Sequence, residues 1–251
     1  MPPAILAVDT SGMCGTLALR RDGQLLEERE LEQSRRRHAQ TLISEVQELL
    51  QAHDLASADI GVVAVSHGPG SFTGLRVGIV FAKTFAYATG CQIVAVDTLQ
   101  AVAEAVSGDE GVSGDEFRGI TRLQVVSDAQ REQLFVSDFH RSPDGDWEAA
   151  RPIDIVDCEA WRNQAAELAS SEFAVSGPGL VKVADDLSQS VHQLPEAMWT
   201  PRAANVAAIA ERLAADGQFA DAFELEPFYL RKSSAEEKRE AKLAAEASGQ
   251  S

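Results

Sequence analysis

The chain has 251 residues, of which 45% are hydrophobic and 24% are charged, a composition typical of a globular protein. Thirty-nine acidic residues against 22 basic ones give a formal net charge of −17, which disfavours autonomous binding to nucleic acid. No apolar run reaches the roughly 20 residues that a membrane-spanning helix needs, so we expect no membrane partner.

The first residues and the cysteines indicate the compartment. The segment MPPAILAVDTS has neither the basic region nor the apolar region of a secretion signal, so we expect a cytoplasmic protein. Cys14, Cys91 and Cys158 are widely separated, which predicts neither a disulfide framework nor a CxxC metal or redox motif. We therefore expect three reduced thiols.

The first hundred residues alternate between strand-like and helix-like patterns. The apolar run AILAV at 4–8 predicts a buried strand, and Asp22-Gly23 predicts a hairpin turn between two further strands. Apolar residues at helical spacing predict a helix over 38–53. Further along we expect strands at 60–65 and 92–96 and a helix at 71–90 that ends at Gly90. The order βββαβαβ predicts an α/β lobe in which helices pack on a mixed sheet.

The second half of the chain predicts another lobe, with a boundary near residue 100. We expect helices at 97–106, 158–169 and 201–217, the second capped by Asp157, and strands at 123–127, 132–139 and 172–180. The acidic stretch 107–116 predicts a solvated loop. These elements predict an N-terminal lobe at 1–100, a C-terminal lobe at 101–231 whose last helix can pack back on the first lobe, and a disordered tail at 232–251.

The loop SHGPGSFTGLRVG at 66–78 invites comparison with known phosphate-binding and catalytic turns. Its glycines follow G-x-G-x-x-x-G, not the dinucleotide fingerprint, and Gly74 is not followed by the lysine of a P-loop. Ser71 lacks the flanking glycines of a nucleophile elbow. Two hypotheses remain: an anion site at the N-terminus of the following helix, or a tight turn in which Ser71 caps that helix.

The helix after this loop is apolar on most of its circumference. Gly74, Gly78, Ala82 and Ala86 recur every four residues and predict a strip that lets another helix approach closely. Large apolar residues, among them Leu75, Ile79 and Phe85, occupy other faces. Such a helix must be covered on more than one side, either by the helix at 38–53 alone or by a protein partner as well.

The segment GPGSFTGLRVG at 68–78 closely resembles the most distinctive segment of the TsaB family, also called YeaZ, a bacterial subunit of the tRNA threonylcarbamoyladenosine machinery. The resemblance covers about residues 4–231 and includes the segments AILAVDTS, RRRHAQTLISEVQELL, VVSDAQREQLF and EPFYLRK. It implies a two-lobed α/β fold of the actin, sugar-kinase and Hsp70 type, with RNase H-like lobes.

The resemblance also implies a catalytically degenerate paralogue of TsaD, the enzyme that transfers threonylcarbamoyl to N6 of adenosine 37 in tRNAs reading ANN codons. TsaD carries a metal through an H-x-x-x-H motif. Here His38 is followed by Leu42 at the second histidine position, and the other histidines are dispersed. We therefore expect no catalytic residue, no metal site and no intrinsic cofactor, with ATP, ADP and metal supplied by partner subunits.

The resemblance implies a non-catalytic subunit that binds and activates a TsaD-type enzyme. The family's first two helices pack against those of TsaD or, without TsaD, form a homodimer; a TsaE-type ATPase is a further partner, and tRNA is reached only through the complex. In this sequence the expected interface comprises Leu42, Val46, Leu49, Gly74, Leu75, Gly78, Ile79, Ala82, Phe85 and Ala86.

Two alternatives remain. An ATP-dependent small-molecule phosphotransferase of the same fold would use Asp9 as its carboxylate. The residues that would contact phosphate or nucleotide, in that enzyme or as a vestige, are Asp9, Thr10, Ser11, Gly68, Gly70, Ser71, Gly177 and Gly179. A peptidase has no metal motif and no nucleophile–base spacing to support it.

Overall fold

The computed structural model describes residues 4–31, 38–106, 117 and 119–230, and the backbone alone for 38–40. Its first sheet has the strand order β3-β2-β1-β4-β5, in which β1 is antiparallel to β2 and parallel to β4. The strands are β1 (Ala4–Asp9), β2 (Thr16–Arg21), β3 (Gln24–Glu30), β4 (Ile60–Gly68) and β5 (Gln92–Asp97). Asp22 and Gly23 both have positive φ, the conformation that the expected hairpin turn needs.

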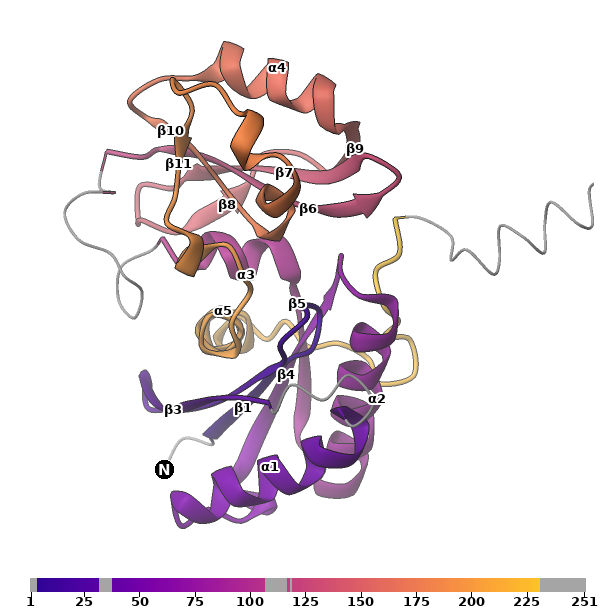
Figure 1. Cartoon of the computed structure of the whole chain (residues 1–251). Coiled ribbons are helices and arrows are strands. Elements are labelled where there is room, and N and C mark those ends of the chain that lie inside the picture. The colour runs from indigo at the N-terminus through magenta and orange to yellow at the C-terminus, as the bar shows by residue number, and fades with distance from the viewer. Residues whose placement is uncertain (1–3, 32–37, 107–116, 118, 231–251) are drawn as a thin grey trace, which may run out of the picture.

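Helices cover both faces of this sheet (Figure 1). Alternate side chains of β1 divide between them: Leu6 and Val8 pack toward α1 (His38–Ala52) and α2 (Phe72–Thr89), whereas Ile5 and Ala7 pack toward α5 (Ala203–Ala215). Because both faces of β1 are buried, this strand is apolar on both sides, which explains the continuous apolar run at the start of the sequence.

The second sheet has the order β11-β10-β6-β7-β8, with β9 paired to β7. Its strands are β6 (Arg122–Gln130), β7 (Gln133–Arg141), β8 (Trp147–Ala149), β9 (Asp154–Asp157), β10 (Phe173–Ser176) and β11 (His192–Gln193). α4 (Cys158–Leu168) packs on one face and α3 (Thr98–Glu104) on the other. Short 3₁₀ helices lie at Ser57–Asp59, Pro178–Lys182, Ala184–Asp186 and Glu196–Met198.

The two lobes are stacked (Figure 1). The second sheet and α4 lie above and the first sheet, α1 and α2 below, with α3 and α5 between the two sheets and in contact. The predicted fold class, an α/β protein of two lobes whose first lobe runs βββαβαβ, is confirmed.

Several expectations need correction. β8, β9 and β11 carry too few apolar residues in alternation to be recognised in the sequence. Asp157 occupies the N-cap of α4 but makes no capping hydrogen bond; its carboxylate accepts a hydrogen bond from Gln133 on β7. The predicted acidic loop at 107–116 and tail at 232–251 lie outside the described residues.

Candidate functional site

α2 begins and ends as its sequence predicts. The Oγ of Ser71 accepts a hydrogen bond from the amide of Gly74 at 3.3 Å, which caps the N-terminus. Gly90 ends the helix in the left-handed conformation with φ of 78°, and its amide donates to the carbonyl of Ala86. This supports the tight-turn reading of the glycine loop.

The small-residue strip of α2 faces the interior of its own lobe. Gly74 and Gly78 lie against Thr10, and a Cβ on Gly78 would lie 2.6 Å from the Thr10 Oγ1. Ala82 and Ala86 are buried in the cluster that includes Ile79 and apolar residues of β4. The strip therefore lets α2 approach β1 and β4, and the expectation that it accommodates another helix is wrong.

The other expected interface residues also lie mainly in the interior. Leu75 and Ile79 are buried beneath α2, and Leu42, Val46 and Leu49 are buried between α1 and the first sheet. Of the ten expected residues, only Leu42 and Phe85 line an open surface depression. The expected residues therefore lie on the two helices that border this depression, but mostly on their inward faces.

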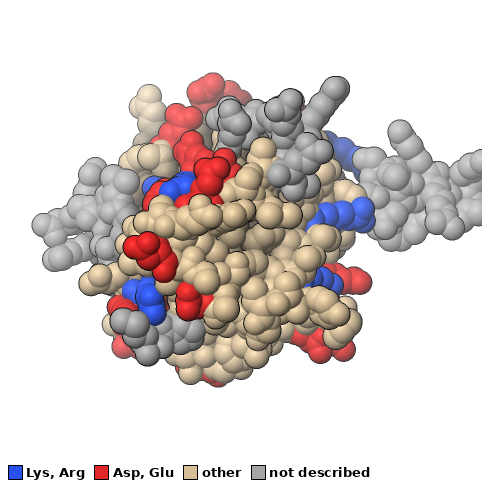
Figure 2. Space-filling model, turned by 90° about the horizontal axis from the view of Figure 1, so that it is seen from below, with Lys and Arg blue, Asp and Glu red and all other residues tan. Residues whose placement is uncertain are grey.

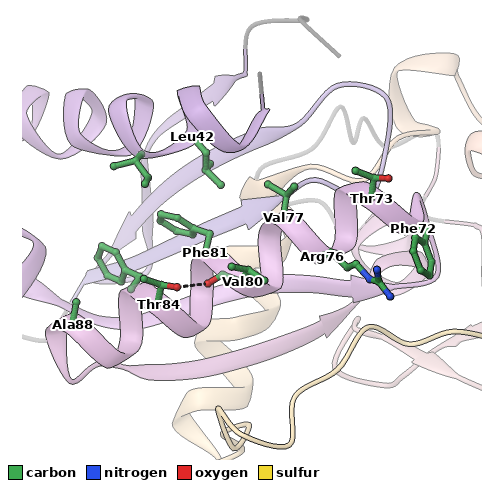
Figure 3. Close-up of a pocket in the computed structure, with 11 residues that line it drawn as sticks. Leu42, Phe72, Thr73, Arg76, Val77, Val80, Phe81, Thr84 and Ala88 are labelled. Atoms are coloured by element: carbon green, nitrogen blue, oxygen red, sulfur yellow. Dashed lines mark hydrogen bonds between the residues drawn. The ribbon is translucent and has the colours of Figure 1, made fainter. Parts of the chain in front are cut away.

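That depression is an apolar groove between α1 and α2, with a volume of about 590 Å³. Val80 is 61% exposed and Ile43 on α1 is 65% exposed, and both line it. Leu42 on α1 and Val77 and Phe81 on α2 point toward one another across its floor (Figure 3). The complete lining is Leu42, Ile43, Phe72, Thr73, Arg76, Val77, Val80, Phe81, Thr84, Phe85 and Ala88.

The lining of the groove carries little charge. Figure 2 views the molecule from below, the side on which α1 lies in Figure 1, and shows a wide area without charged side chains. Among the lining residues, Arg76 alone is charged. In an acid-rich chain, so large an exposed apolar hollow indicates a surface that another apolar surface covers.

The candidate phosphate contacts of the first lobe form a closed hydrogen-bonded turn. The Asp9 carboxylate is fully buried and accepts hydrogen bonds from the Ser11 amide and hydroxyl and from the Ser66 hydroxyl. Burial raises the pKa of Asp9, and those bonds partly offset the rise. Its oxygens already have donors within the chain, an arrangement that fits a structural role better than that of a general base.

The glycine loop packs directly on that turn. The Ser71 amide donates to the Ser11 carbonyl at 2.7 Å, and a Cβ on Gly70 would lie 2.7 Å from the same oxygen. The Thr10 hydroxyl donates to the Gly74 carbonyl at 2.7 Å. Close packing of two backbone segments therefore accounts for these residues without a bound anion.

The remaining candidate contacts lie in two other places. Gly68 packs against Phe228, where an added Cβ would lie 2.7 Å from the Phe228 carbonyl oxygen. Gly177 and Gly179 lie at the start of the 3₁₀ helix after β10 and pack against β6, where a Cβ on Gly177 would lie 2.2 Å from the Val126 carbonyl oxygen. Each glycine allows a close approach of two segments of this chain.

Comparison with known proteins agrees with this architecture. A family model described as TsaD, tRNA N6-adenosine threonylcarbamoyltransferase, matches residues 25–145. The protein named tRNA threonylcarbamoyladenosine biosynthesis protein TsaB from Escherichia coli is 28% identical over 228 residues, which cover 90% of this chain and 94% of that relative. The chain is thus similar to TsaB over nearly its whole length.

Two further proteins are also similar to this chain. The protein of the same name from Bacillus subtilis is 32% identical over 131 residues, which cover 52% of each chain. The solved structure of YeaZ from Pseudomonas aeruginosa aligns with a TM-score of 0.75 and 24% identity, covering 91% of this chain and 100% of that one. This structural likeness shows the shared fold.

The described residues show neither a metal-ligand cluster nor a membrane-spanning helix. No group of three or more His, Cys, Asp or Glu side chains there could hold a metal ion. The side chain of His38, from which the broken H-x-x-x-H motif begins, lies outside the described residues. Among the described helices, none has the length and apolar character that crossing a bilayer requires.

Sequence reasoning missed the exposed stripe of α2. Arg76, Val80, Thr84 and Ala88 follow one another at intervals of four and form the outer wall of the groove. A sequence pattern that could have indicated this stripe was present, because its residues are smaller or more polar than the aromatic residues that line the groove. The sequence alone does not show which face of α2 is exposed, because that depends on the contact of Gly74 and Gly78 with Thr10.

Proposed function

We propose that this chain is a non-catalytic accessory subunit that binds and activates a TsaD-type transferase. The transferase forms N6-threonylcarbamoyladenosine at position 37 of tRNAs that read ANN codons. The observation that carries the proposal is the apolar groove between α1 and α2, which exposes Ile43 and Val80 and has Arg76 as the one charged residue of its lining. Similarity to TsaB proteins suggests the identity of the partner.

Covering the groove is favourable in free energy. Burying apolar surface contributes roughly 25 cal/mol per Å², so helices that fill the groove gain from each exposed apolar side chain they cover. The N-terminal lobe presents α1 and α2 side by side, and a pair of partner helices laid along them would complete a four-helix arrangement. The same surface would support a homodimer when the transferase is absent.

The other partners follow from charge and chemistry. A net charge of −17 repels a polyanion, so tRNA is reached only through the complex. ATP or ADP and the metal belong to the TsaD-type subunit and to a TsaE-type ATPase. All these components act in the cytoplasm, where we place this chain.

The test is reconstitution of tRNA modification. The TsaD-type and TsaE-type subunits of the same organism are assayed with and without this chain, with unmodified tRNA as substrate. We expect modification to depend on the chain. Equal modification without it would contradict the proposal.

The phosphotransferase alternative has its own test. It requires tight Mg-ATP binding by the isolated chain, whereas we expect none, because Asp9 is buried and hydrogen-bonded to Ser11 and Ser66. Calorimetry of the isolated chain with Mg-ATP distinguishes the two functions. Micromolar binding would favour the phosphotransferase.

A further inference from the structure

Arg76 occupies the end of the groove nearest the N-terminus of α2, where Figure 3 shows it beside Phe72. The centre of its guanidinium lies 3.9 Å from the Phe72 ring centroid, a cation–π contact. Its Nε donates a hydrogen bond of 3.1 Å to the hydroxyl of Tyr229. The Tyr229 ring in turn stacks on Phe72 with centroids 4.8 Å apart. The guanidinium is therefore held in place before any partner binds.

Tyr229 reaches this position through a C-terminal strap, residues 218–230. Ala220 pairs with Ile93 on the edge of the first sheet, and Leu225 is buried in the core under α2. The Phe228 amide then donates to the His67 carbonyl at 2.7 Å, at the end of β4. The contacts of the strap thus bring Tyr229 to one end of the groove.

The charge on Arg76 is not neutralised within the described part of the chain. There, its guanidinium has no carboxylate within salt-bridge distance, and its two Nη nitrogens have no hydrogen-bond partner. Other arginines of this acid-rich chain are paired: Arg20 with Glu211, Arg162 with Asp186, and Arg212 with Glu104. An oriented, unpaired cation at the end of an apolar groove suits an anionic group on whatever fills the groove.

We infer that Arg76, positioned by Phe72 and Tyr229, is the charged specificity determinant of the groove, and that its occupant is an apolar helix with an Asp or Glu at the end beside Arg76. This inference rests on the proposed function and specifies the chemistry of the partner's surface. Because the groove next to Arg76 is apolar, a protein carboxylate fits it better than an RNA phosphate, which would bring a strand of charge over Val77 and Val80.

The test measures the dissociation constant between the full-length chain and the TsaD-type subunit at low and high salt. We expect Arg76→Gln to weaken binding about 10-fold and Arg76→Glu about 100-fold, while Arg76→Lys retains most of the affinity. The salt dependence of binding should shrink in Arg76→Gln, since one ion pair is lost. A single Asp or Glu→Arg change on the partner helix should restore binding to Arg76→Glu.

The control is Arg122→Glu, because Arg122 is an exposed arginine beside an aromatic ring, Phe173, on the second sheet. We expect it to leave affinity within about twofold. Tyr229→Phe keeps the ring stack and removes the hydroxyl, so it should weaken binding by a few-fold with no loss of folding. Circular dichroism and melting temperatures check the fold of each variant.

Failure of this inference differs from failure of the proposed function. If Val80→Glu abolishes binding while Arg76→Glu changes affinity less than twofold, the groove binds the partner and the role of Arg76 is wrong. If Arg76→Glu weakens tRNA binding by the complex but leaves the subunit affinity unchanged, the anion is a phosphate and the inference is overturned. If Val80→Glu has no effect either, the proposed function is wrong.

Discussion

Thr10 and Gly74 are in direct contact, so closely that a Cβ on Gly74 would lie 1.9 Å from the Thr10 carbonyl oxygen. The Thr10 hydroxyl also donates to the Gly74 carbonyl at 2.7 Å. This pair fixes the first turn of α2 against the end of β1. It determines which face of α2 points inward and therefore which face lines the groove.

The first prediction concerns Gly74→Ala. Helix propensity alone would make alanine more stable by up to about 1 kcal/mol. The clash with Thr10 reverses that sign, and we expect a loss of at least about 2 kcal/mol in the free energy of unfolding. Urea unfolding followed by circular dichroism measures it.

The matched control for that prediction is Gly12→Ala. A Cβ on Gly12 would lie 3.8 Å from its nearest neighbour, the Cys14 carbonyl oxygen, which is ordinary contact. We expect a change within about 1 kcal/mol. Equal effects of Gly74→Ala and Gly12→Ala would contradict the close packing of α2 on Thr10.

Local patterns predicted the first lobe well because each signal there acts over a few residues. The Asp22-Gly23 turn, the Ser71 cap and the Gly90 ending each depend on neighbouring backbone atoms, and all three are confirmed. The inward face of α2 could not be predicted in this way. It depends on contact with Thr10, 64 residues earlier in the chain.

The strap was beyond prediction for a related reason. The segment EPFYLRK contributed to the family resemblance, but nothing in its pattern shows that Phe228 pairs with His67 or that Tyr229 lies on Phe72. Such contacts join segments more than a hundred residues apart, with no periodic signal. The Arg76 site therefore emerges only from the three-dimensional structure.

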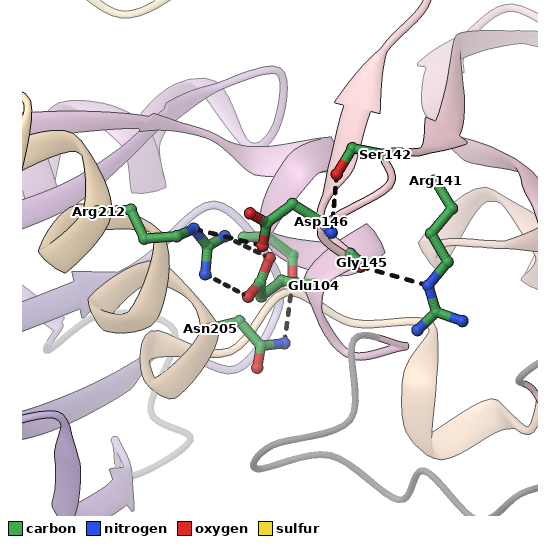
Figure 4. A network of polar contacts seen from close by, with 8 residues as sticks. Glu104, Arg141, Ser142, Gly145, Asp146, Asn205 and Arg212 are labelled. Atoms are coloured by element: carbon green, nitrogen blue, oxygen red, sulfur yellow. Dashed lines mark hydrogen bonds and ion pairs between the residues drawn. The ribbon is translucent and has the colours of Figure 1, made fainter.

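An ion-pair network joins the two lobes. Arg212 on α5 makes a two-pronged contact with Glu104 on α3 at 2.8 and 2.7 Å, and its Nε lies 3.7 Å from Asp146 in the turn before β8 (Figure 4). Asn205 on the same helix donates to the Ala101 carbonyl at 2.9 Å. The Glu104 side chain is only 8% exposed, so its charge depends on this partner.

We predict that Arg212→Met lowers the free energy of unfolding by about 2 kcal/mol, because the Glu104 carboxylate is left buried without its partner. The double variant Arg212→Met with Glu104→Leu should recover most of that loss. Arg162→Met is the control, since its partner Asp186 is 72% exposed, and should cost less than about 0.5 kcal/mol. An additive double variant would argue against coupling of the two residues.

Asp97 gives the fold a pH dependence. Burial raises the pKa of Asp97 from 3.8 to about 6, and hydrogen bonds from the Gln100 and Leu99 amides partly offset the rise. The folded state therefore holds this proton more tightly than the unfolded state. Its contribution to stability falls as the pH rises from the unfolded pKa through the folded one.

The corresponding variant is Asp97→Asn, which keeps the capping geometry of α3 and cannot ionise. Between about pH 5 and pH 7.5, we expect the stability of this variant relative to the natural chain to increase by about 1 kcal/mol. Asp144→Asn, at an exposed position before β8, controls for the loss of a negative charge. A difference between Asp97→Asn and the natural chain that stays constant with pH would contradict the prediction.

The central claim is that the groove between α1 and α2 binds the TsaD-type subunit. The most direct measurement is the dissociation constant of that complex for Val80→Glu and for its control Val181→Glu, two exposed valines of which only Val80 lines the groove. We predict that Val80→Glu weakens binding at least about 100-fold, because it places a charge within the apolar contact, whereas Val181→Glu changes it less than twofold. Equal affinity of both variants for the TsaD-type subunit would contradict the account.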